Sequence, residues 1–268
     1  SIQKMYAASV KRRVFTKAQA TAGLDRIYAS KEYPDMQNCD MVIEAAVENL
    51  ELKKKIFADL SERVPEDTIL ATNTSALPIH ELSKVISNPC RLVGIHFFNP
   101  VLRMKLVEVV TTPDTSDATL STAVKFTQSI GKLPVVVKDS PGFLVNRILM
   151  PYLVGAGELM SQGVDIEMID KAMLDFGMPM GPLRLLDEVG LDVSCHVAET
   201  LAAAFPERMS VPKILTDMVE KGMLGRKSGN GFYLYKGKDS KVNPAAKALQ
   251  STSSENVNIQ EILGGLMQ

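Results

Sequence analysis

The sequence has little of several features that mark specialised classes of protein. Its 268 residues carry 30 basic and 31 acidic side chains, so the formal net charge of −1 gives no general attraction to nucleic acid or anionic membranes. No apolar run approaches the roughly 20 residues of a transmembrane helix. The cysteines, Cys39, Cys90 and Cys195, are scattered without C-x-x-C spacing, which indicates reduced thiols in an intracellular compartment.

Metal-ligand clusters and glycine-rich phosphate loops are also missing from the sequence. His80, His96 and His196 lie too far apart along the chain to suggest a metal site. No G-x-G-x-x-G occurs, so the chain lacks the turn that brings a dinucleotide pyrophosphate to a helix N-terminus. What is present, 46% hydrophobic and 23% charged residues, is an ordinary globular composition in a chain long enough for two domains.

Apolar periodicity predicts an α/β domain followed by an all-α domain. Short apolar runs alternate with amphipathic stretches, which favours a parallel sheet. Thr16 and Gln19 have the spacing of a capping box, which starts a second helix within the first helical stretch. The expected strands are 40–46, 69–72, 91–97, 105–111 and 133–138, and the expected helices of this domain are 2–29, 50–64, 79–86 and 118–130.

A proline–glycine segment at 139–142 marks the expected domain boundary. Ser140 is a candidate cap and Pro141 a candidate first residue of a long helix that runs to about Gln162. Helical periodicity continues to Gly222, and an extended segment is expected at 231–235.

The remaining residues, 236–268, are predicted to be a linker. They are polar, with a Ser-Thr-Ser-Ser run at 251–254, and they stop at an apolar turn, 261–265, that has nothing after it to pack on. The resulting division of the chain is 1–138, 139–235 and 236–268.

The strongest candidate for chemistry is a histidine and a glutamate on two apolar runs. If 94–100 and 104–110 fold back as a hairpin centred on Leu102, antiparallel pairing sets His96 opposite Glu108, with Cβ atoms roughly 5 Å apart. An imidazole held by a carboxylate has a defined tautomer and can act as a general base. Taken alone, such a pair is more often a half-buried histidine satisfied by one carboxylate.

Two further polar residues fall at or beyond the carboxyl ends of expected parallel strands, where ligands bind in such sheets. These are Glu48 and Ser75, which join His96 from separate segments. Ser75 alone is more often a helix cap. Asn146 lies in an apolar stretch of the long helix and needs a hydrogen-bond partner if buried, for which a domain-bridging bond is the plainer explanation.

Six motifs in one order resemble the 3-hydroxyacyl-CoA dehydrogenase family over almost the whole chain. The residues of these motifs are most similar to the dehydrogenase portion of the multifunctional α-subunits of fatty-acid β-oxidation. The motifs occupy 42–50, 73–79, 94–100, 138–147, 178–182 and 225–229. The resemblance implies a truncated Rossmann-type doubly wound sheet that lacks its first strand and glycine-rich turn, followed by an all-α domain.

The resemblance also implies NAD-dependent oxidation of (3S)-3-hydroxyacyl-CoA to 3-ketoacyl-CoA. His96 is expected to take the proton and Glu108 to orient the imidazole. The substrate oxygen is expected to be held by Ser75 and Asn146. Cofactor-binding positions of the family match Glu48, Lys53, Asn99 and Lys227, with no metal. For the two lysines a solvated surface role is a strong alternative, since Lys53 lies beside two further lysines.

The family extends its N-terminal helical pair toward the thioester substrate. The basic run at 11–13 is therefore equally a candidate contact for coenzyme A phosphates and a plain solvent-facing charge cluster. The expected partners are 3-hydroxyacyl-CoA, a second copy of the chain and a thiolase-type subunit. The expected compartment is the cytoplasm, or the mitochondrial matrix or peroxisome in a eukaryote.

Without a glycine-rich unit we expect weak dinucleotide binding and an exposed strand edge that invites self-association. Both ends of the chain are expected to be cut from a longer protein. An alternative function is therefore a cofactor-deficient binding or assembly module of a multifunctional complex.

Overall fold

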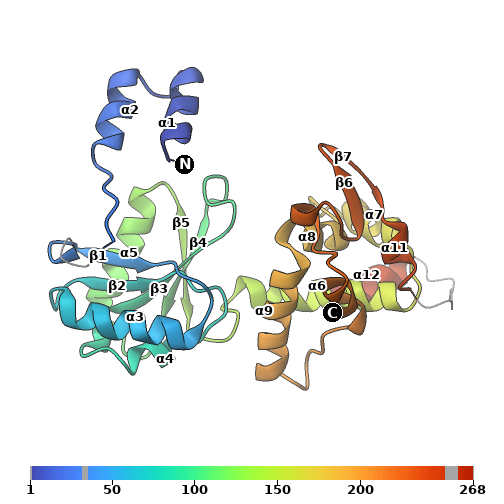
Figure 1. Ribbon diagram of the computed structural model, residues 1–268. Coiled ribbons are helices and arrows are strands. Elements are labelled where there is room, and N and C mark those ends of the chain that lie inside the picture. The colour runs from blue at the N-terminus through green and yellow to red at the C-terminus, as the bar shows by residue number, and fades with distance from the viewer. Residues whose placement is uncertain (1, 32–35, 251–258, 268) are drawn as a thin grey trace.

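A five-stranded mixed sheet forms the first part of the molecule. The computed structural model describes residues 2–31, 36–250 and 259–267 (Figure 1). Neighbouring strands follow chain order: β1 (Met41–Glu44), β2 (Ile69–Thr72), β3 (Leu92–Phe97), β4 (Leu106–Thr111) and β5 (Leu133–Lys138). The first three are parallel, β4 runs antiparallel to β3, and β5 runs parallel to β4. The prediction of an α/β sheet is confirmed.

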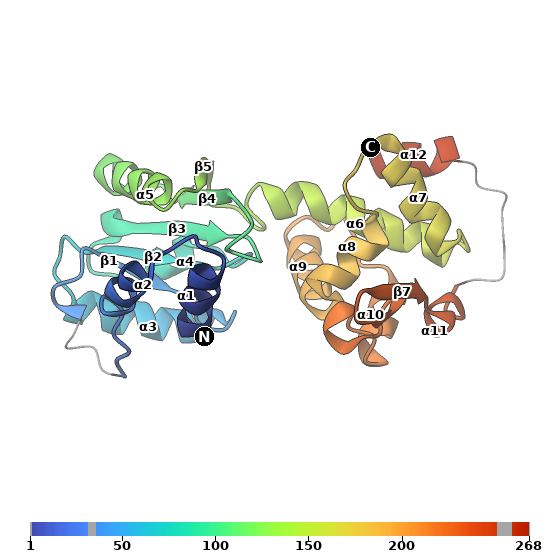
Figure 2. The same cartoon turned by 90° about the horizontal axis from the view of Figure 1, so that it is seen from above.

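Helices cover both faces of this sheet, because its strands are apolar on both sides. Figure 2 shows α5 (Asp117–Ser129) on one side and α3 (Leu50–Arg63) with the short α4 (His80–Ser83) on the other. A single 3₁₀ turn (Pro89–Arg91) precedes β3. Alternate residues of one strand enter different cores: Leu70 packs with the helix α3 cluster, and Ala71 with the α5 cluster. The expected helix 79–86 is shorter than predicted.

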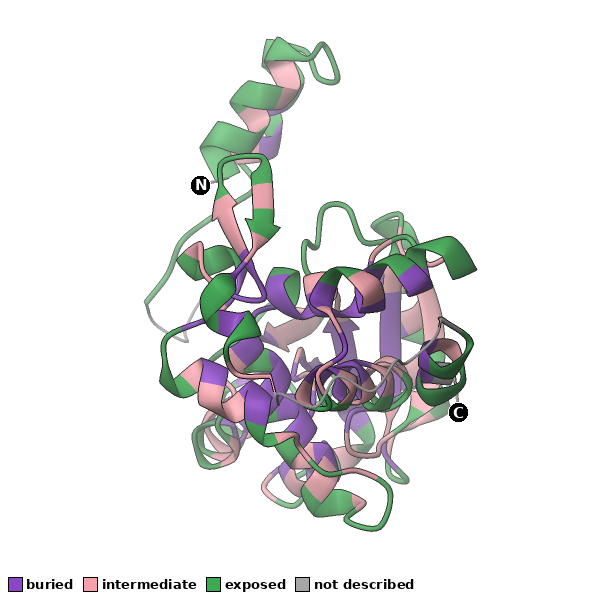
Figure 3. Ribbon diagram, turned by 90° about the vertical axis from the view of Figure 1, so that its right-hand side faces the viewer, coloured by how far each residue is buried: buried purple, intermediate pink, exposed green. Residues whose placement is uncertain are grey.

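A pair of helices stands apart from the sheet (Figure 1). These are α1 (Ile2–Lys11) and α2 (Lys17–Leu24), in which the Tyr6 ring of α1 lies against Gly23 of α2. The Tyr6 ring also lies 5.9 Å from that of Phe15 in the connecting turn. The predicted capping box is confirmed, because Thr16 and Gln19 exchange side-chain and backbone hydrogen bonds. Helix α1 has no buried residue, and Figure 3 shows this pair as mostly exposed.

The second part of the molecule is helical, as predicted, and is organised around α6 (Val145–Ser161). Its core gathers Leu153, Met160, Ile169 and Leu186 from successive helices. The other elements are α7 (Ile166–Phe176), α8 (Pro182–Val189), α9 (Leu191–Ala204), α10 (Lys213–Glu220), a 3₁₀ turn η3 (Arg226–Ser228), β6 (Tyr233–Lys236), β7 (Asp239–Val242), α11 (Pro244–Lys247) and α12 (Ile259–Met267).

The predicted start of the long helix is wrong. Helix α6 begins at Val145, and neither Ser140 nor Pro141 caps it. Two consecutive residues, Gly142 and Phe143, have left-handed φ angles of 69° and 50°, which no α-helix can contain. This turn buries the Phe143 ring beside the imidazole of His96, with ring centroids 5.7 Å apart. Asn146 consequently lies in the first turn of α6.

The interpretation of 236–268 as a linker missed three elements. Strand β7 pairs with β6, and α11 follows directly. The expected apolar turn at 261–265 belongs to α12, which packs against α6 and α7 and fully buries Ile262. The Ser-Thr-Ser-Ser run lies outside the described residues. In the part of the chain that is described, no helix is long and apolar enough to cross a membrane.

Candidate active site

The candidate site lies at the edge of the sheet where the parallel strands β1, β2 and β3 end. Glu44 and Thr72 are the last residues of their strands, and His96 is the next-to-last residue of β3. Because parallel strands point their carboxyl ends to one edge, three separate segments meet there. Glu48 and Ser75 lie in the loops that follow β1 and β2.

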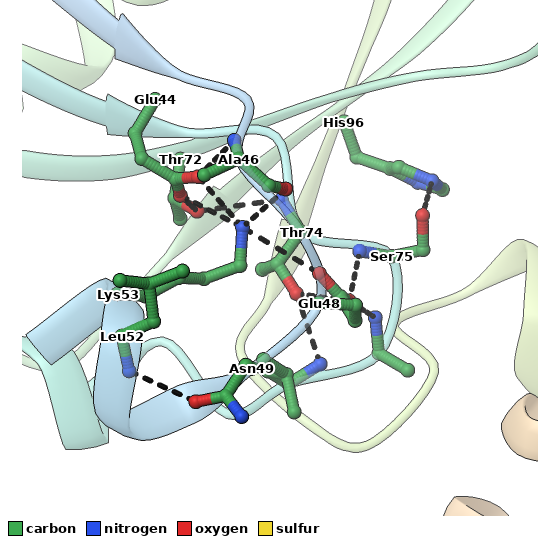
Figure 4. Close-up of polar contacts among 12 residues, drawn as sticks. Glu44, Ala46, Glu48, Asn49, Leu52, Lys53, Thr72, Thr74, Ser75 and His96 are labelled. Atoms are coloured by element: carbon green, nitrogen blue, oxygen red, sulfur yellow. Dashed lines mark hydrogen bonds and ion pairs between the residues drawn. The ribbon is translucent and has the colours of Figure 1, made fainter.

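His96 connects Glu108 to Ser75. The predicted register is confirmed, since His96 on β3 pairs with Glu108 on β4. The imidazole Nδ1 lies 2.7 Å from Glu108 Oε2, and Nε2 lies 3.1 Å from Ser75 Oγ (Figure 4 shows the Ser75 bond). His96 is only 4% exposed and Glu108 is fully buried. The structure therefore brings three of the four predicted catalytic side chains into one line of hydrogen bonds.

The hydrogen-bond partners fix the tautomer of the imidazole. An ionised carboxylate only accepts hydrogen bonds, so Nδ1 must donate to Glu108. In the neutral ring Nε2 then carries the lone pair and accepts the hydroxyl proton of Ser75. The basic nitrogen thus faces the half-buried serine and not the protein interior.

Glu108 is held from its other side by the start of α6. Its Oε1 accepts hydrogen bonds from the backbone N–H groups of Leu144 and Val145, each at 2.9 Å. Backbone donors at a helix N-terminus favour a negative charge. One residue further, Asn146 donates from Nδ2 to the carbonyl oxygen of Ser75 at 3.0 Å. The helical part therefore contacts both ends of the Ser75–His96–Glu108 line.

Two aromatic rings enclose the imidazole. The ring of Phe98, the residue after β3, lies 4.5 Å from the His96 ring between centroids, and the ring of Phe143 lies 5.7 Å from it. Such contacts restrict rotation of the ring and exclude water from it. They leave Nε2 and Ser75 as the polar outlet of the cluster.

A second polar cluster holds the Ser75 loop (Figure 4). Glu48 Oε1 accepts hydrogen bonds from Thr74 Oγ1 at 2.5 Å, from the Ser75 N–H at 2.9 Å and from the Ala76 N–H at 3.2 Å. The Nζ atom of Lys53 lies 3.5 Å from the other oxygen of Glu48. Glu48 is thus a structural partner of Ser75 as well as a predicted cofactor ligand.

Lys53 itself is buried, contrary to its alternative description as a solvated surface lysine. It is 1% exposed and bonds both carboxylate oxygens of Glu44, at 2.7 and 2.9 Å. Its spacing with Phe57 and Leu60, at i, i+4 and i+7, is that of the buried face of α3. That spacing could have identified it, whereas Glu44 gave no signal beyond being the acid at a strand end.

The other two predicted cofactor residues are exposed in this structure. Asn99 follows the end of β3, three residues after His96. Lys227 lies in η3 of the helical part, where its Nζ pairs with Asp192 at the start of α9. Their cofactor roles stay predictions. The described residues contain no group of histidines, cysteines and carboxylates that could hold a metal ion.

Two buried aspartates, which the sequence analysis missed, explain the motifs at 178–182 and 225–229. Asp170 accepts hydrogen bonds from the N–H groups at the start of α8, and Asp187 from those of Phe232 and Tyr233. Burial raises the pKa of Asp187 to about 6. A Cβ atom on Gly181 would lie 2.3 Å from Asp170 Cγ, so glycine is required there for packing.

Comparison with known proteins gives one family over most of the chain. Residues 1–140 match the family described as 3-hydroxyacyl-CoA dehydrogenase, NAD binding domain, and residues 142–235 match its C-terminal domain. Fatty acid oxidation complex subunits alpha from Vibrio parahaemolyticus and Pseudomonas savastanoi are 41% and 42% identical over 253 and 249 residues. These alignments cover 94% and 91% of this chain but 36% and 34% of those proteins, so the chain spans about a third of their length.

Solved structures of 3-hydroxybutyryl-CoA dehydrogenases are also similar to this chain. A 3-hydroxybutyryl-CoA dehydrogenase from Escherichia coli is 37% identical, with a TM-score of 0.84 over 90% of this chain and 52% of that one. The (S)-3-hydroxybutyryl-CoA dehydrogenase from Ralstonia eutropha is 40% identical, with a TM-score of 0.83 over 87% of this chain and 83% of that one.

Proposed function

This chain belongs to the 3-hydroxyacyl-CoA dehydrogenase family, and we propose that its protein oxidises (3S)-3-hydroxyacyl-CoA to 3-ketoacyl-CoA with NAD in fatty-acid β-oxidation. The observation that carries the proposal is the line of hydrogen bonds from Ser75 through His96 to Glu108. Hydroxyl oxidation needs a base that removes the O–H proton while hydride leaves the carbon. His96 has its lone pair on the nitrogen that faces the outlet of the cluster.

Each residue of the line has a distinct task. A substrate hydroxyl placed beside Ser75 gives its proton to His96 Nε2. Glu108 stabilises the resulting imidazolium, because its Oε2 stays hydrogen-bonded to Nδ1. Asn146 has one amide N–H engaged with the Ser75 carbonyl, and its remaining amide groups are the candidate contact for the substrate oxygen.

The residues present fit one end of the dinucleotide. NAD supplies the hydride acceptor when it is bound. Glu48 keeps 28% of its side chain exposed at the carboxyl edge of the sheet and can accept a ribose hydroxyl, and Asn99 lies exposed after the end of β3. The buried ammonium of Lys53 contacts carboxylates instead. For the pyrophosphate there is no G-x-G-x-x-G in this sequence.

A second candidate function follows from that missing turn. The chain then acts as a binding or assembly module, through a second copy of itself or a thiolase-type partner. The relatives' names, which describe subunits of a complex, support assembly. The complete Ser75–His96–Glu108 line supports catalysis, because an assembly module has no need of an oriented buried imidazole.

The deciding experiment replaces the base. His96→Gln is measured in a version of the chain extended at its N-terminus by a glycine-rich βαβ unit from a relative, with NAD and 3-hydroxybutyryl-CoA. General-base catalysis is worth about 10²–10⁴-fold, so kcat should fall by that factor while KM changes little. His196→Gln, the same change at an exposed position on α9, is the matched control. A loss of only a few-fold in His96→Gln would remove the assignment.

A further inference from the structure

We infer that Lys53 is a positioning residue for the Ser75–His96 pair and acts on it through Glu48. The inference rests on the proposed function, in which Ser75 and His96 belong to the reacting site. This task is additional to the cofactor contact that the family resemblance implies for Lys53. The route runs from α3 through the loop after β1 to the loop after β2 (Figure 4).

The first step is that acceptors of the protein surround the ammonium. Lys53 has 1% of its surface exposed, so its ammonium group lies among protein atoms. Nζ has three N–H donors, and four oxygens lie around it: both carboxylate oxygens of Glu44, the Ala46 carbonyl at 3.4 Å and Glu48 Oε2 at 3.5 Å. Its hydrogen-bonding capacity is used inside the protein.

The second step is that Glu44 anchors the lysine to the sheet. Glu44 is itself buried at the end of β1, where it accepts hydrogen bonds from Thr72 Oγ1 on β2 at 2.8 Å and from the Ala46 N–H at 2.5 Å. The head of Lys53 is therefore fixed relative to two strands. A fixed charge can orient a neighbour, whereas a mobile surface lysine cannot.

The third step is that Glu48 divides its two oxygens between Lys53 and the Ser75 loop. Oε2 faces Lys53, and Oε1 accepts three hydrogen bonds from 74–76. Without the positive charge, Glu44 and Glu48 would be two carboxylates in one partly buried site, which repel each other. Glu48 would then turn toward solvent and release the amides of Ser75 and Ala76.

The fourth step links the loop to the base. Ser75 Oγ lies on His96 Nε2, and Ser75 has no other side-chain bond among the described contacts. Movement of its backbone therefore changes the hydrogen bond at the basic nitrogen. Lys53 influences that nitrogen through two intermediate residues, Glu48 and Ser75.

The test uses the chain as it is, without cofactor. In Lys53→Met, the exchange rates of the Ser75 and Ala76 amide hydrogens should rise about tenfold, as expected when a charge-assisted hydrogen bond is lost. The ¹⁵N signals of the His96 ring should change, and with three histidines in the chain they are readily assigned. Lys54→Met is the matched control, since Lys54 is the next residue and pairs with Glu51 and Glu81 near the surface. It should leave both measurements unchanged.

A double-mutant cycle distinguishes action through Glu48 from a general loosening. Glu48→Gln should give a similar rise in exchange, and Lys53→Met with Glu48→Gln should give no more than Glu48→Gln alone. Effects that multiply in the double variant would overturn the route through Glu48. Wild-type exchange and ring signals in a folded Lys53→Met would overturn the inference itself.

A second variant covers the case in which Lys53→Met does not fold. Glu44→Gln with Lys53→Met replaces the buried ion pair by neutral groups of similar shape, which avoids an unpaired buried charge. It should fold, and exchange at Ser75 and Ala76 should rise less than in Lys53→Met, because the contact of Lys53 with Glu48 is lost but Glu44 no longer repels Glu48. If neither variant folds, or if Glu44→Gln with Lys53→Met retains wild-type exchange at Ser75 and Ala76, the inference is wrong. These measurements need no turnover, so they fail independently of the His96→Gln assay.

Discussion

Replacing Glu108 by glutamine should move the imidazole proton of His96 from Nδ1 to Nε2, while a side chain of the same size still fills the position of Glu108. Glu108 accepts three hydrogen bonds: two from backbone N–H groups at the start of α6 and one from His96 Nδ1. Glutamine has one oxygen, and the two backbone donors can only be satisfied by it. Its NH₂ group then faces Nδ1, which must become an acceptor. The ring proton moves to Nε2, the nitrogen that the proposed reaction needs unprotonated.

The size of the effect can be worked out from these contacts. Loss of the base function removes about 10²–10⁴-fold in kcat, and in serine proteases the equivalent Asp→Asn change costs about 10⁴-fold because the tautomer is wrong. Three charge-assisted hydrogen bonds become neutral ones, and at about 1 kcal/mol each this lowers the free energy of unfolding by about 3 kcal/mol. Since that is a fraction of a domain's usual stability, the variant should fold.

Two assays check this prediction. Proton-coupled ¹⁵N spectra of the ring should show hydrogen on Nδ1 in the wild-type protein and on Nε2 in Glu108→Gln. Turnover in the N-terminally extended chain should fall by the factor above, with KM nearly unchanged, and the pH–rate profile should change shape. A folded variant whose ring keeps its proton on Nδ1, or whose kcat stays within a few-fold of wild type, would refute the reasoning.

Three further predictions concern stability and binding. Burial raises the pKa of Asp187 from 3.8 to about 6, so the folded chain binds this proton more tightly than the unfolded chain does. The protonated carboxyl therefore contributes roughly 3 kcal/mol to the free energy of unfolding below pH 3.8, and this contribution is lost as the pH rises through about 6. Denaturation of wild type and Asp187→Asn between those pH values checks it, because the variant should lack that slope. Gly231→Ala would place a Cβ 1.9 Å from Asp187 Oδ1 and should lower the free energy of unfolding by about 1–3 kcal/mol. Gly264→Ala, in α12, is the control, because nothing lies within 4 Å of a Cβ there and its φ is not left-handed; equal losses would contradict the packing argument. The chain of this sequence should give no measurable heat with NADH in calorimetry, since it lacks the glycine-rich turn, and a micromolar Kd would disprove that.

Patterns that depend on period two were predictable from the sequence. The register that sets His96 opposite Glu108 follows from two apolar runs and the length between them, and the structure has that register. The sheet and its helices were predictable because short apolar runs alternate with amphipathic stretches. Side chains alternate strictly along a strand, so one correct pairing places all of them.

Features that depend on tertiary contact were not predictable in this way. Pro141 suggested a helix start, but the left-handed turn at Gly142 and Phe143 delays it to Val145, because Phe143 is drawn beside His96. The buried state of Lys53 needed the i, i+4, i+7 spacing of α3 to outweigh the neighbouring lysines. Helix α12 packs against α6 and α7, and no local sequence pattern describes such a contact.

The bonds from α6 to Glu108 have a consequence for exchanging parts between relatives. The carboxylate lies in the segment that matches the NAD-binding domain, and its two backbone donors lie in the segment that matches the C-terminal domain. Backbone donors carry no side-chain identity, so this junction tolerates sequence change at Leu144 and Val145 but not a change of spacing or a proline at either position. A chimaera of two relatives should therefore keep the turn length between β5 and α6, even where every side chain of the helical part is foreign. The orientation of the base therefore depends on contacts between the two domains and not on either domain alone.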